Sequence, residues 1–146
     1  MQAPQVPPST EIRSRYRLRT RWSDEDNQKV LNNAVYLTLF EEARFAYFSE
    51  LGLLDENQFS FLLAQTDVRF LRPGSGGAEV VIEIVTTHLG ASSFTQAYRV
   101  GPDGAEPWAE GEALLVAWDN GTRAKCAMRP AFRAAIAAHE GIVDRA

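Results

Sequence analysis

The stretch that decides the fold and the chemistry of this chain is WSDEDNQKVLNNAVY, residues 22–36. It holds three acidic residues in a short run, then Asn32 and Asn33, which are typical of a helix start, and then an amphipathic segment. A carboxylate just ahead of a helix N-terminus is a recurring arrangement for splitting an activated acyl group. The acid supplies a nucleophile or a base, and the unpaired N–H groups of the first helical turn polarise the carbonyl.

A long helix follows this stretch. The spacing of apolar residues predicts it from about Asn33 to Leu51, and Gly52 suits the position just past its end. Either Asn32 or Asn33 can serve as the N-cap, because an asparagine side chain accepts a hydrogen bond from an N–H of the first turn. The packed face of this helix is marked by apolar residues three to four apart: Tyr36, Phe40, Ala43, Tyr47 and Leu51.

The segment from Ile12 to Trp22 alternates with a period of two residues, as a half-buried strand does. One face carries Ile12, Tyr16, Leu18, Thr20 and Trp22, and the other carries Arg13, Arg15, Arg17, Arg19 and Arg21. Two interpretations of the arginine face stay open. It is either a solvated basic surface or a stripe of which part receives the phosphates of a large anionic cofactor.

Strand patterns predominate further along the chain. Four more strands are predicted at 60–72, 78–89, 91–100 and 108–119, with Pro130 opening a short helix over about 131–139. The short connections favour antiparallel neighbours in a meander, because a parallel pair needs a long crossover. This order predicts an α+β protein with a flexible tail at residues 1–10 and a single domain at 11–146. In that domain one long helix packs against one antiparallel sheet of about five strands.

Composition limits the function classes. With 146 residues, 45% hydrophobic and 23% charged, the chain is typical of one globular domain. The formal net charge of -4 disfavours nucleic acid as the main partner, and no apolar run approaches the roughly 18 residues of a membrane span. The single cysteine, Cys126, excludes an internal disulfide and a cysteine-based metal cluster. We therefore expect a cytoplasmic protein that holds no metal and binds neither nucleic acid nor membrane.

The motifs resemble those of hotdog-fold acyl-CoA thioesterases, in particular the 4-hydroxybenzoyl-CoA thioesterase-like and YbgC/FadM-like groups. Their pattern reads D-x-D-x-x-G-H-V-N-N-x-x-Y, followed by F-E-x-A-R along the helix. The chain matches it at Asp24, Asp26, Asn32, Asn33, Tyr36, Phe40, Glu41, Ala43 and Arg44. Residues 70–73 and 89–94 also resemble later family segments, so the resemblance covers about residues 13–132. It implies a hotdog fold, in which the sheet wraps around the central helix.

For the reaction, the resemblance implies hydrolysis of an acyl thioester to the free acid and CoA, with Asp26 as the catalytic residue. Asp26 would either attack the thioester carbonyl, giving an anhydride, or act as a general base on water. The thioester oxygen would lie against the first N–H groups of the helix, at Asn33, Ala34 and Val35. No cofactor is implied beyond the CoA of the substrate.

The resemblance also implies partners. The substrate would be a thioester of CoA or of acyl-carrier protein. Hotdog domains usually join sheet edges into one continuous sheet, with each acyl tunnel at the subunit interface, so we expect a homodimer or a homotetramer.

The chain departs from the family pattern at Lys29 and Val30, which replace its Gly-His pair, and at Leu31, which replaces its valine. Glycine at that place frees the backbone for a close approach to the ligand, so Lys29 must adopt the same conformation at a cost, or the loop takes another path. This departure keeps a non-catalytic acyl-thioester-binding protein open as the alternative to the enzyme. A hydratase on the same fold would need a histidine where Val30 stands.

Three residues are further candidates for substrate binding: Tyr36, Ser92 and Ser93. A core position suits Tyr36 better, and strand starts commonly carry serine. Glu41 is a reserve acid, because some hotdog enzymes place their catalytic carboxylate on this helix.

The remaining charged residues of these motifs have simpler interpretations. Asp24 suits a turn or an ion pair, and Glu42 and Arg44 suit ordinary surface positions on the helix. Arg123 and Lys125, which follow the Asn-Gly turn at 120–121, are candidate phosphate contacts by charge alone.

Overall fold

The computed structural model describes residues 11–144, so the predicted tail at residues 1–10 lies outside the described residues. Its elements run in the order β1 (Ser14–Arg19), a 3-10 turn η1 (Trp22–Asp24), α1 (Asn33–Glu50), β2 (Phe61–Phe70), β3 (Glu79–Leu89), β4 (Ser93–Gly101), β5 (Ala109–Asp119), β6 (Ala124–Lys125) and α2 (Pro130–Glu140). The long helix and the four strands predicted after it are therefore confirmed, with bounds that differ by one or two residues at most ends.

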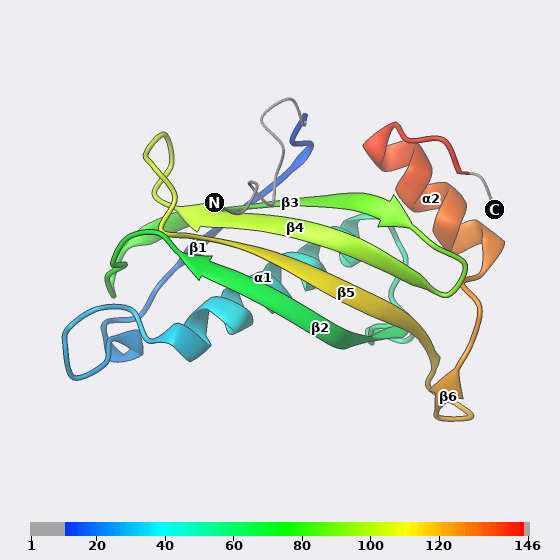
Figure 1. The fold of residues 1–146 in the computed structure, drawn as a ribbon, viewed down its shortest axis with the longest axis horizontal. Coiled ribbons are helices and arrows are strands. Elements are labelled where there is room, and N and C mark those ends of the chain that lie inside the picture. Colours follow the sequence, from blue (N-terminus) through cyan, green and yellow to red (C-terminus); the bar gives the residue numbers. More distant parts are fainter. Residues whose placement is uncertain (1–10, 145–146) are drawn as a thin grey trace.

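The strands form one antiparallel sheet in the order β1-β3-β4-β5-β2, with β6 paired to β5. The expected meander is correct for β3, β4 and β5 but wrong for β2. This strand does not pair with β3; it lies beside β5 at one edge of the sheet (Figure 1). The reason is that β1 occupies the free edge of β3, pairing Arg19 with Glu79 and Ser14 with Ile84. Residues 71–78 then carry the chain from β2 at one edge of the sheet to β3, which lies next to the other edge, and no local pattern reveals this crossing.

Helix α1 lies along one face of this sheet (Figure 1). The predicted packed face is confirmed, since Tyr36, Phe40, Ala43 and Tyr47 are all buried against the sheet, while Leu51 is half-buried. Asn32 is the N-cap: its side-chain oxygen accepts the N–H of Ala34 at 2.9 Å. A helix that buries so many aromatic side chains is held by tertiary packing more than by its own propensity.

The opposite face of the sheet carries a row of alternating charges, one residue from each of the five main strands. In cross-strand register these are Arg15, Glu83, Arg99, Glu110 and Arg69. Arg15 and Arg99 both pair with Glu83, at 2.7 and 3.2 Å, and Arg69 pairs with Glu110 at 3.0 Å. Opposite charges directly across a sheet attract each other, so the row neutralises part of the arginine stripe.

Two side chains occupy places that the sequence did not predict. Trp22 was expected on the buried face of the first strand, but that strand ends at Arg19 and Trp22 is 81% exposed. Arg44 was expected at the surface, but it is 6% exposed and donates to the hydroxyl of Tyr98 at 2.9 Å. Its guanidinium also lies over the Tyr98 ring, 5.5 Å from the centroid, so a cation–π contact helps to hold it in the core.

Candidate active site at the start of the long helix

The segment from Asp24 to Asn32 forms a small hairpin that leads into α1 at one end of the molecule (Figure 1). Asn32 donates its N–H to the carbonyl of Asp24 at 2.9 Å, and Asp26 donates to the carbonyl of Val30 at 2.8 Å. Lys29 closes the turn by donating to the carbonyl of Asp26 at 3.0 Å. These bonds fix the backbone of Asp26 a few residues before the helix begins.

Lys29 has a φ of 61°, in the left-handed region that favours glycine. Of the two outcomes expected for this departure from the family pattern, the structure has the first: lysine adopts the conformation and the turn is kept. A lysine thus holds a backbone conformation in this turn that favours glycine.

The carboxylate of Asp26 is half-buried and already has one local role. One of its oxygens accepts the N–H of Gln28 at 2.8 Å, as an aspartate in a turn commonly does. Within residues 11–144, the second oxygen has no hydrogen-bond donor. That oxygen is therefore available to a substrate or to a water molecule.

Asp24 has a structural role, as the sequence suggested. It is 8% exposed, and it accepts hydrogen bonds from the backbone N–H and the guanidinium of Arg21 at 2.8–3.1 Å. Burial alone would raise the pKa of Asp24, but the hydrogen bonds and charge of Arg21 outweigh it and hold that pKa below its ordinary value. Asp24 thus stays ionised and fixes the start of the hairpin. Asp26 is the aspartate whose second carboxylate oxygen is available to a substrate.

The first turn of α1 offers fewer donors than the three expected at Asn33, Ala34 and Val35. The N–H of Ala34 is bonded to the Asn32 side chain, and the N–H of Val35 to the Asn32 carbonyl at 3.0 Å. In the part of the chain that the structure describes, the N–H of Asn33 has no acceptor. An exposed N–H at a helix N-terminus favours a negatively charged oxygen, so Asn33 is the candidate oxyanion donor.

A glycine-rich loop at residues 74–77 supports this hairpin, a role that the sequence showed only as a turn. The carbonyl of Gly74 accepts the N–H of Leu31 at 3.0 Å, and the N–H of Gly76 donates to the Glu25 carboxylate at 2.9 Å. A Cβ on Gly74 would come within 2.6 Å of the Trp108 ring and 2.7 Å of the Tyr36 hydroxyl. Only glycine lets the loop approach so closely, because any other residue would displace these side chains.

The other predicted site residues are spread along the molecule. Tyr36 is 2% exposed and its ring packs edge-on against Phe70 at 5.2 Å, so it is a core residue beside the hairpin. Glu41 is exposed on α1, and within residues 11–144 it forms no hydrogen bond. Ser92 and Ser93 lie at the other end of the sheet, where β4 begins, roughly 35 Å from the hairpin along strands of this length. The chain therefore places Asp26 in the hairpin that leads to Asn33, and it keeps both serines away from that hairpin.

Solved structures share this architecture. A thioesterase from Thermus thermophilus, crystallised with coenzyme A and Zn, is 35% identical, with a TM-score of 0.78 over 89% of this chain and 96% of that one. Slr0204, a 1,4-dihydroxy-2-naphthoyl-CoA thioesterase from Synechocystis, is 20% identical with a TM-score of 0.74 over 84% of this chain and 94% of that one, and at this identity it shows the fold alone. The expected hotdog fold is thus confirmed, and it defines the class of the protein.

The family follows from the sequence itself. Residues 20–136 match the family described as the Thioesterase-like superfamily, and the chain belongs to it. It is also 31% identical to the uncharacterized protein YsmA of Bacillus subtilis over 97 residues, 66% of either chain. Family and neighbours together support thioester hydrolysis as the type of reaction.

Within residues 11–144 no helix is long and apolar enough to cross a membrane. No group of three or more His, Cys, Asp or Glu side chains in that range is arranged to hold a metal ion.

Proposed function

We propose that this protein hydrolyses an acyl-CoA to the free acid and CoA in the cytoplasm, with Asp26 as the catalytic carboxylate. The observation that supports this most is that two polar groups near the start of α1 have no hydrogen-bond partner among the described residues. Asp26 keeps one carboxylate oxygen without a donor, and Asn33 keeps its N–H without an acceptor, among the residues described. A thioester with its carbonyl oxygen on Asn33 would present its carbonyl carbon to that turn.

Two routes from this arrangement balance chemically. In one, an Asp26 oxygen bonds to the carbonyl carbon, the C–S bond breaks and the thiolate leaves; water then splits the anhydride. In the other, Asp26 takes a proton from a water molecule as the water oxygen bonds to the carbonyl carbon, and the C–S bond then breaks and the thiolate leaves. Both develop negative charge on the thioester oxygen, next to the Asn33 N–H. No general acid is required, because a thiolate is a good leaving group.

The test is thiol release from a panel of short, long and aromatic acyl-CoAs, with the wild type beside Asp26→Asn. Asparagine can still accept the N–H of Gln28, so this variant removes the charge and keeps the turn. We expect kcat to fall by about two to four orders of magnitude, as for loss of a general base. Full activity in a folded Asp26→Asn protein would refute the assignment of Asp26.

The non-catalytic alternative rested on the missing Gly-His pair. Since Lys29 reproduces the glycine backbone conformation, that argument is weaker. Tight acyl-CoA binding by calorimetry, without thiol release from any member of the panel, would favour the alternative over the enzyme.

We also propose that two chains pair through β2. This strand lies at the edge of the sheet, and it is exposed over most of its length although it carries Leu62 and Leu63, at 48% and 45% exposure. Phe70 and Leu71 continue the apolar edge, at 51% and 42%. A long exposed apolar edge strand is a template for pairing with another chain, and a two-fold axis at β2 would join the two sheets.

A further inference from the structure

Arg44 is a buried cation without an acidic partner. It is 6% exposed, and among residues 11–144 its guanidinium forms no ion pair. Within that range its only hydrogen bond goes to the hydroxyl of Tyr98, and the guanidinium lies over the ring of the same neutral side chain. A buried charge is costly unless an opposite charge compensates it, so this cation lacks the partner that its position requires.

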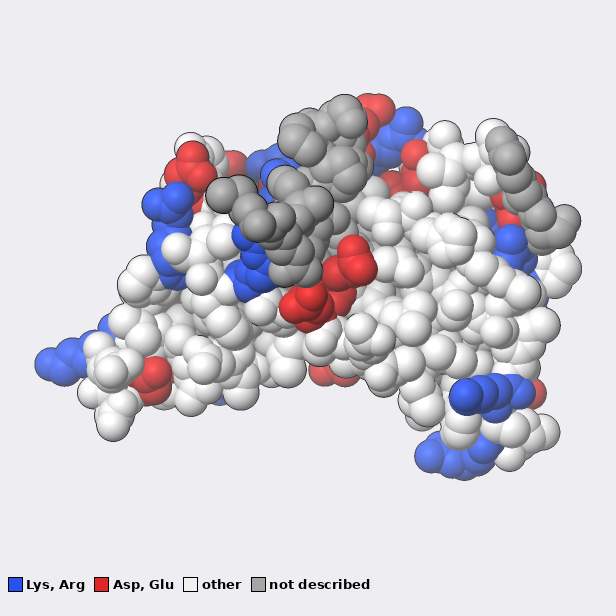
Figure 2. Space-filling view, viewed as in Figure 1, with Lys and Arg blue, Asp and Glu red and all other residues white. Residues whose placement is uncertain are grey.

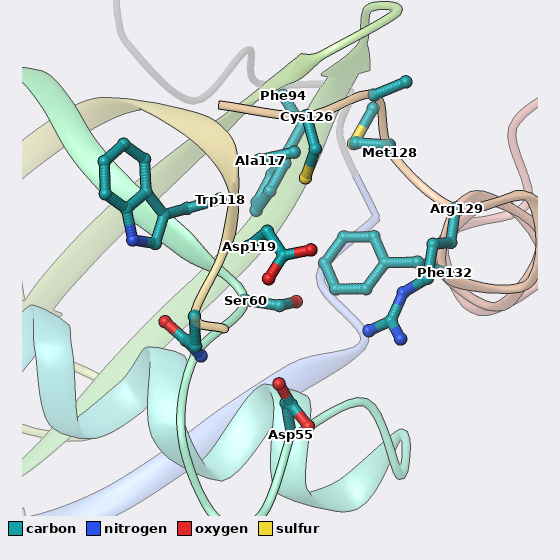
Figure 3. A pocket seen from close by; sticks show the side chains of 12 residues that line it. Asp55, Ser60, Phe94, Ala117, Trp118, Asp119, Cys126, Met128, Arg129 and Phe132 are labelled. Carbon is teal, nitrogen blue, oxygen red and sulfur yellow. The ribbon is translucent and has the colours of Figure 1, made fainter. Parts of the chain in front are cut away.

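Other cations of the protein are solvated or lie near acids. Arg133 is equally buried, but the carboxylate of Asp144 lies 2.6 Å from it. Most of the remaining Lys and Arg side chains are exposed, and red side chains neighbour blue ones at several places on the surface (Figure 2). Arg129 lines a pocket of about 210 Å3 together with the carboxylates of Asp55 and Asp119 (Figure 3).

The guanidinium of Arg44 keeps one edge free. Its hydrogen bond to Tyr98 uses Nη1. Within the described residues Nε and Nη2 have no acceptor, and both retain solvent-accessible surface. These two nitrogens form one edge of the planar guanidinium, and such an edge binds both oxygens of a carboxylate through two parallel hydrogen bonds.

Arg44 lies on the same side of α1 as Asn33, the candidate oxyanion donor. Eleven residues separate them, close to three helical turns, so Arg44 is roughly 16 Å further along the axis. Four residues past Arg44, the ring of Phe48 packs against Phe61 of β2, with 4.9 Å between the centroids. Arg44 therefore faces the β2 side of the helix, where we propose that a partner chain pairs.

Apolar side chains line this side between Asn33 and Arg44. Leu37 of α1 is 42% exposed there. Leu63 and Phe70 of β2 lie opposite core residues of β5, so they point to the face of the sheet that α1 covers. An acyl chain has apolar contacts along this path. Because a helical side chain leans toward the helix N-terminus, the span to the guanidinium is shorter than the axial distance and suits a medium-length chain.

Resting on the proposed function, we propose that Arg44 selects the acyl group by binding a carboxylate at its far end. The preferred substrate is then the CoA thioester of a medium-length dicarboxylic acid. With the thioester carbonyl at Asn33, its chain runs along α1 and its free carboxylate meets the Nε–Nη2 edge. That carboxylate supplies the missing negative charge, whereas a methyl end leaves the cation buried and unpaired. Arg44 is thus a specificity-determining residue, about three turns away from the reacting carbonyl.

The test compares thioesters that differ only at the far end of the chain. The pairs are suberoyl- and octanoyl-CoA, sebacoyl- and decanoyl-CoA, and dodecanedioyl- and dodecanoyl-CoA. We expect the wild-type kcat/KM to favour the dicarboxylic member of at least one pair by about tenfold or more. In Arg44→Met this preference should disappear or reverse, because the carboxylate then meets an apolar side chain. Arg44→Lys should keep part of it, since an ammonium supplies the charge without the fork.

Arg44→Met is a suitable variant because it leaves no buried donor unpaired. The Tyr98 hydroxyl still donates to the side-chain oxygen of Gln96 at 2.8 Å. Removal of an uncompensated buried cation should leave the urea midpoint unchanged or raise it. The matched control is Arg17→Met, which removes the same charge from an exposed arginine paired to Asp103 and should leave every preference within about twofold.

Equal wild-type kcat/KM values within every pair would overturn the proposal. So would a dicarboxylic preference that survives in Arg44→Met, or a lower urea midpoint of this variant with no change in preference. A wild type indifferent to the far end, with a dimer that Arg44→Met dissociates in light scattering, would also overturn it. That result would assign the free edge of Arg44 to a carboxylate of the partner chain.

Failure of the proposed function is distinguishable from failure of this site. If the wild type hydrolyses none of these thioesters, the proposed function fails, and calorimetry with sebacoyl-CoA and decanoyl-CoA decides the role of Arg44. Tighter binding of sebacoyl-CoA that is lost in Arg44→Met would support the carboxylate site. Equal affinities of the wild type for the two thioesters would reject it.

Discussion

Lys29 donates its backbone N–H to the carbonyl oxygen of Asp26 at 3.0 Å while it holds a left-handed φ of 61°. The turn that fixes the candidate catalytic carboxylate is thus closed by a residue with a side chain where the family has glycine. A non-glycine residue with a left-handed φ costs roughly 1–2 kcal/mol relative to glycine. Replacing it by glycine would recover only part of this, because glycine loses more conformational entropy on folding.

Lys29→Gly should therefore stabilise the protein by about 0.5–1 kcal/mol. Lys29→Ala is the matched control, since it removes the same charge and keeps the Cβ that makes the conformation unfavourable. Urea unfolding of the three proteins measures the difference. Equal stabilities of the glycine and alanine variants would show that the left-handed conformation is not what determines the effect.

Gly74→Ala should destabilise the protein by about 1–3 kcal/mol, because the new methyl group would overpack the site where Trp108 and Tyr36 meet the loop. The Gly74 carbonyl also holds the N–H of Leu31, so thioester hydrolysis should fall with stability. The exposed neighbour Ser75→Ala is the control and should change the free energy of unfolding by less than about 0.5 kcal/mol. A Gly74→Ala protein as stable as this control would contradict the packing argument.

Leu63→Lys should separate the proposed dimer, because a charge on the exposed apolar part of an edge strand opposes pairing with a second edge. Light scattering would report monomers, and thioester hydrolysis should fall because each site then lacks its partner. Val143→Lys, at another exposed apolar side chain with 78% exposure, should leave the assembly unchanged. A dimeric Leu63→Lys protein with full activity would argue against pairing through β2.

All four tyrosines should make the protein sensitive to alkali. Burial raises the pKa of Tyr98 to about 12 in spite of Arg44, and burial also raises the pKa values of Tyr16, Tyr36 and Tyr47. For Tyr16 and Tyr47, neighbouring carboxylates add to this. The folded state therefore binds these protons more tightly than the unfolded chain does. This stabilisation is present in full below the unfolded pKa near 10 and is lost as the pH rises toward the folded value.

The free energy of unfolding should accordingly begin to fall near pH 10, by up to about 1.4 kcal/mol per pH unit for each tyrosine that ionises on unfolding. Urea unfolding across this range, compared with tyrosinate absorbance, checks it. Tyr98→Phe should show a shallower decline, since one ionisable group is gone. A stability that stays constant up to about pH 12 would show that these hydroxyls are not protected.

Local sequence signals predicted the parts of this protein that local interactions control. The helix from Asn33, its cap at Asn32 and its packed aromatic face follow from hydrogen bonds and spacings within a few residues. The position of Asp26 ahead of the helix is equally local. For the same reason the strand segments were predicted with small errors, apart from the early end of β1 before Trp22.

Tertiary structure decided everything that depends on partners far along the chain. Strand pairing put β2 beside β5 rather than β3, buried Arg44 against Tyr98, and supplied acid partners to the arginine stripe. It also placed Ser92 and Ser93 at the opposite end of the sheet from Asp26. The reason is physical: residue periodicity fixes which face a side chain takes, whereas its neighbours on adjacent strands come from segments that share no local signal.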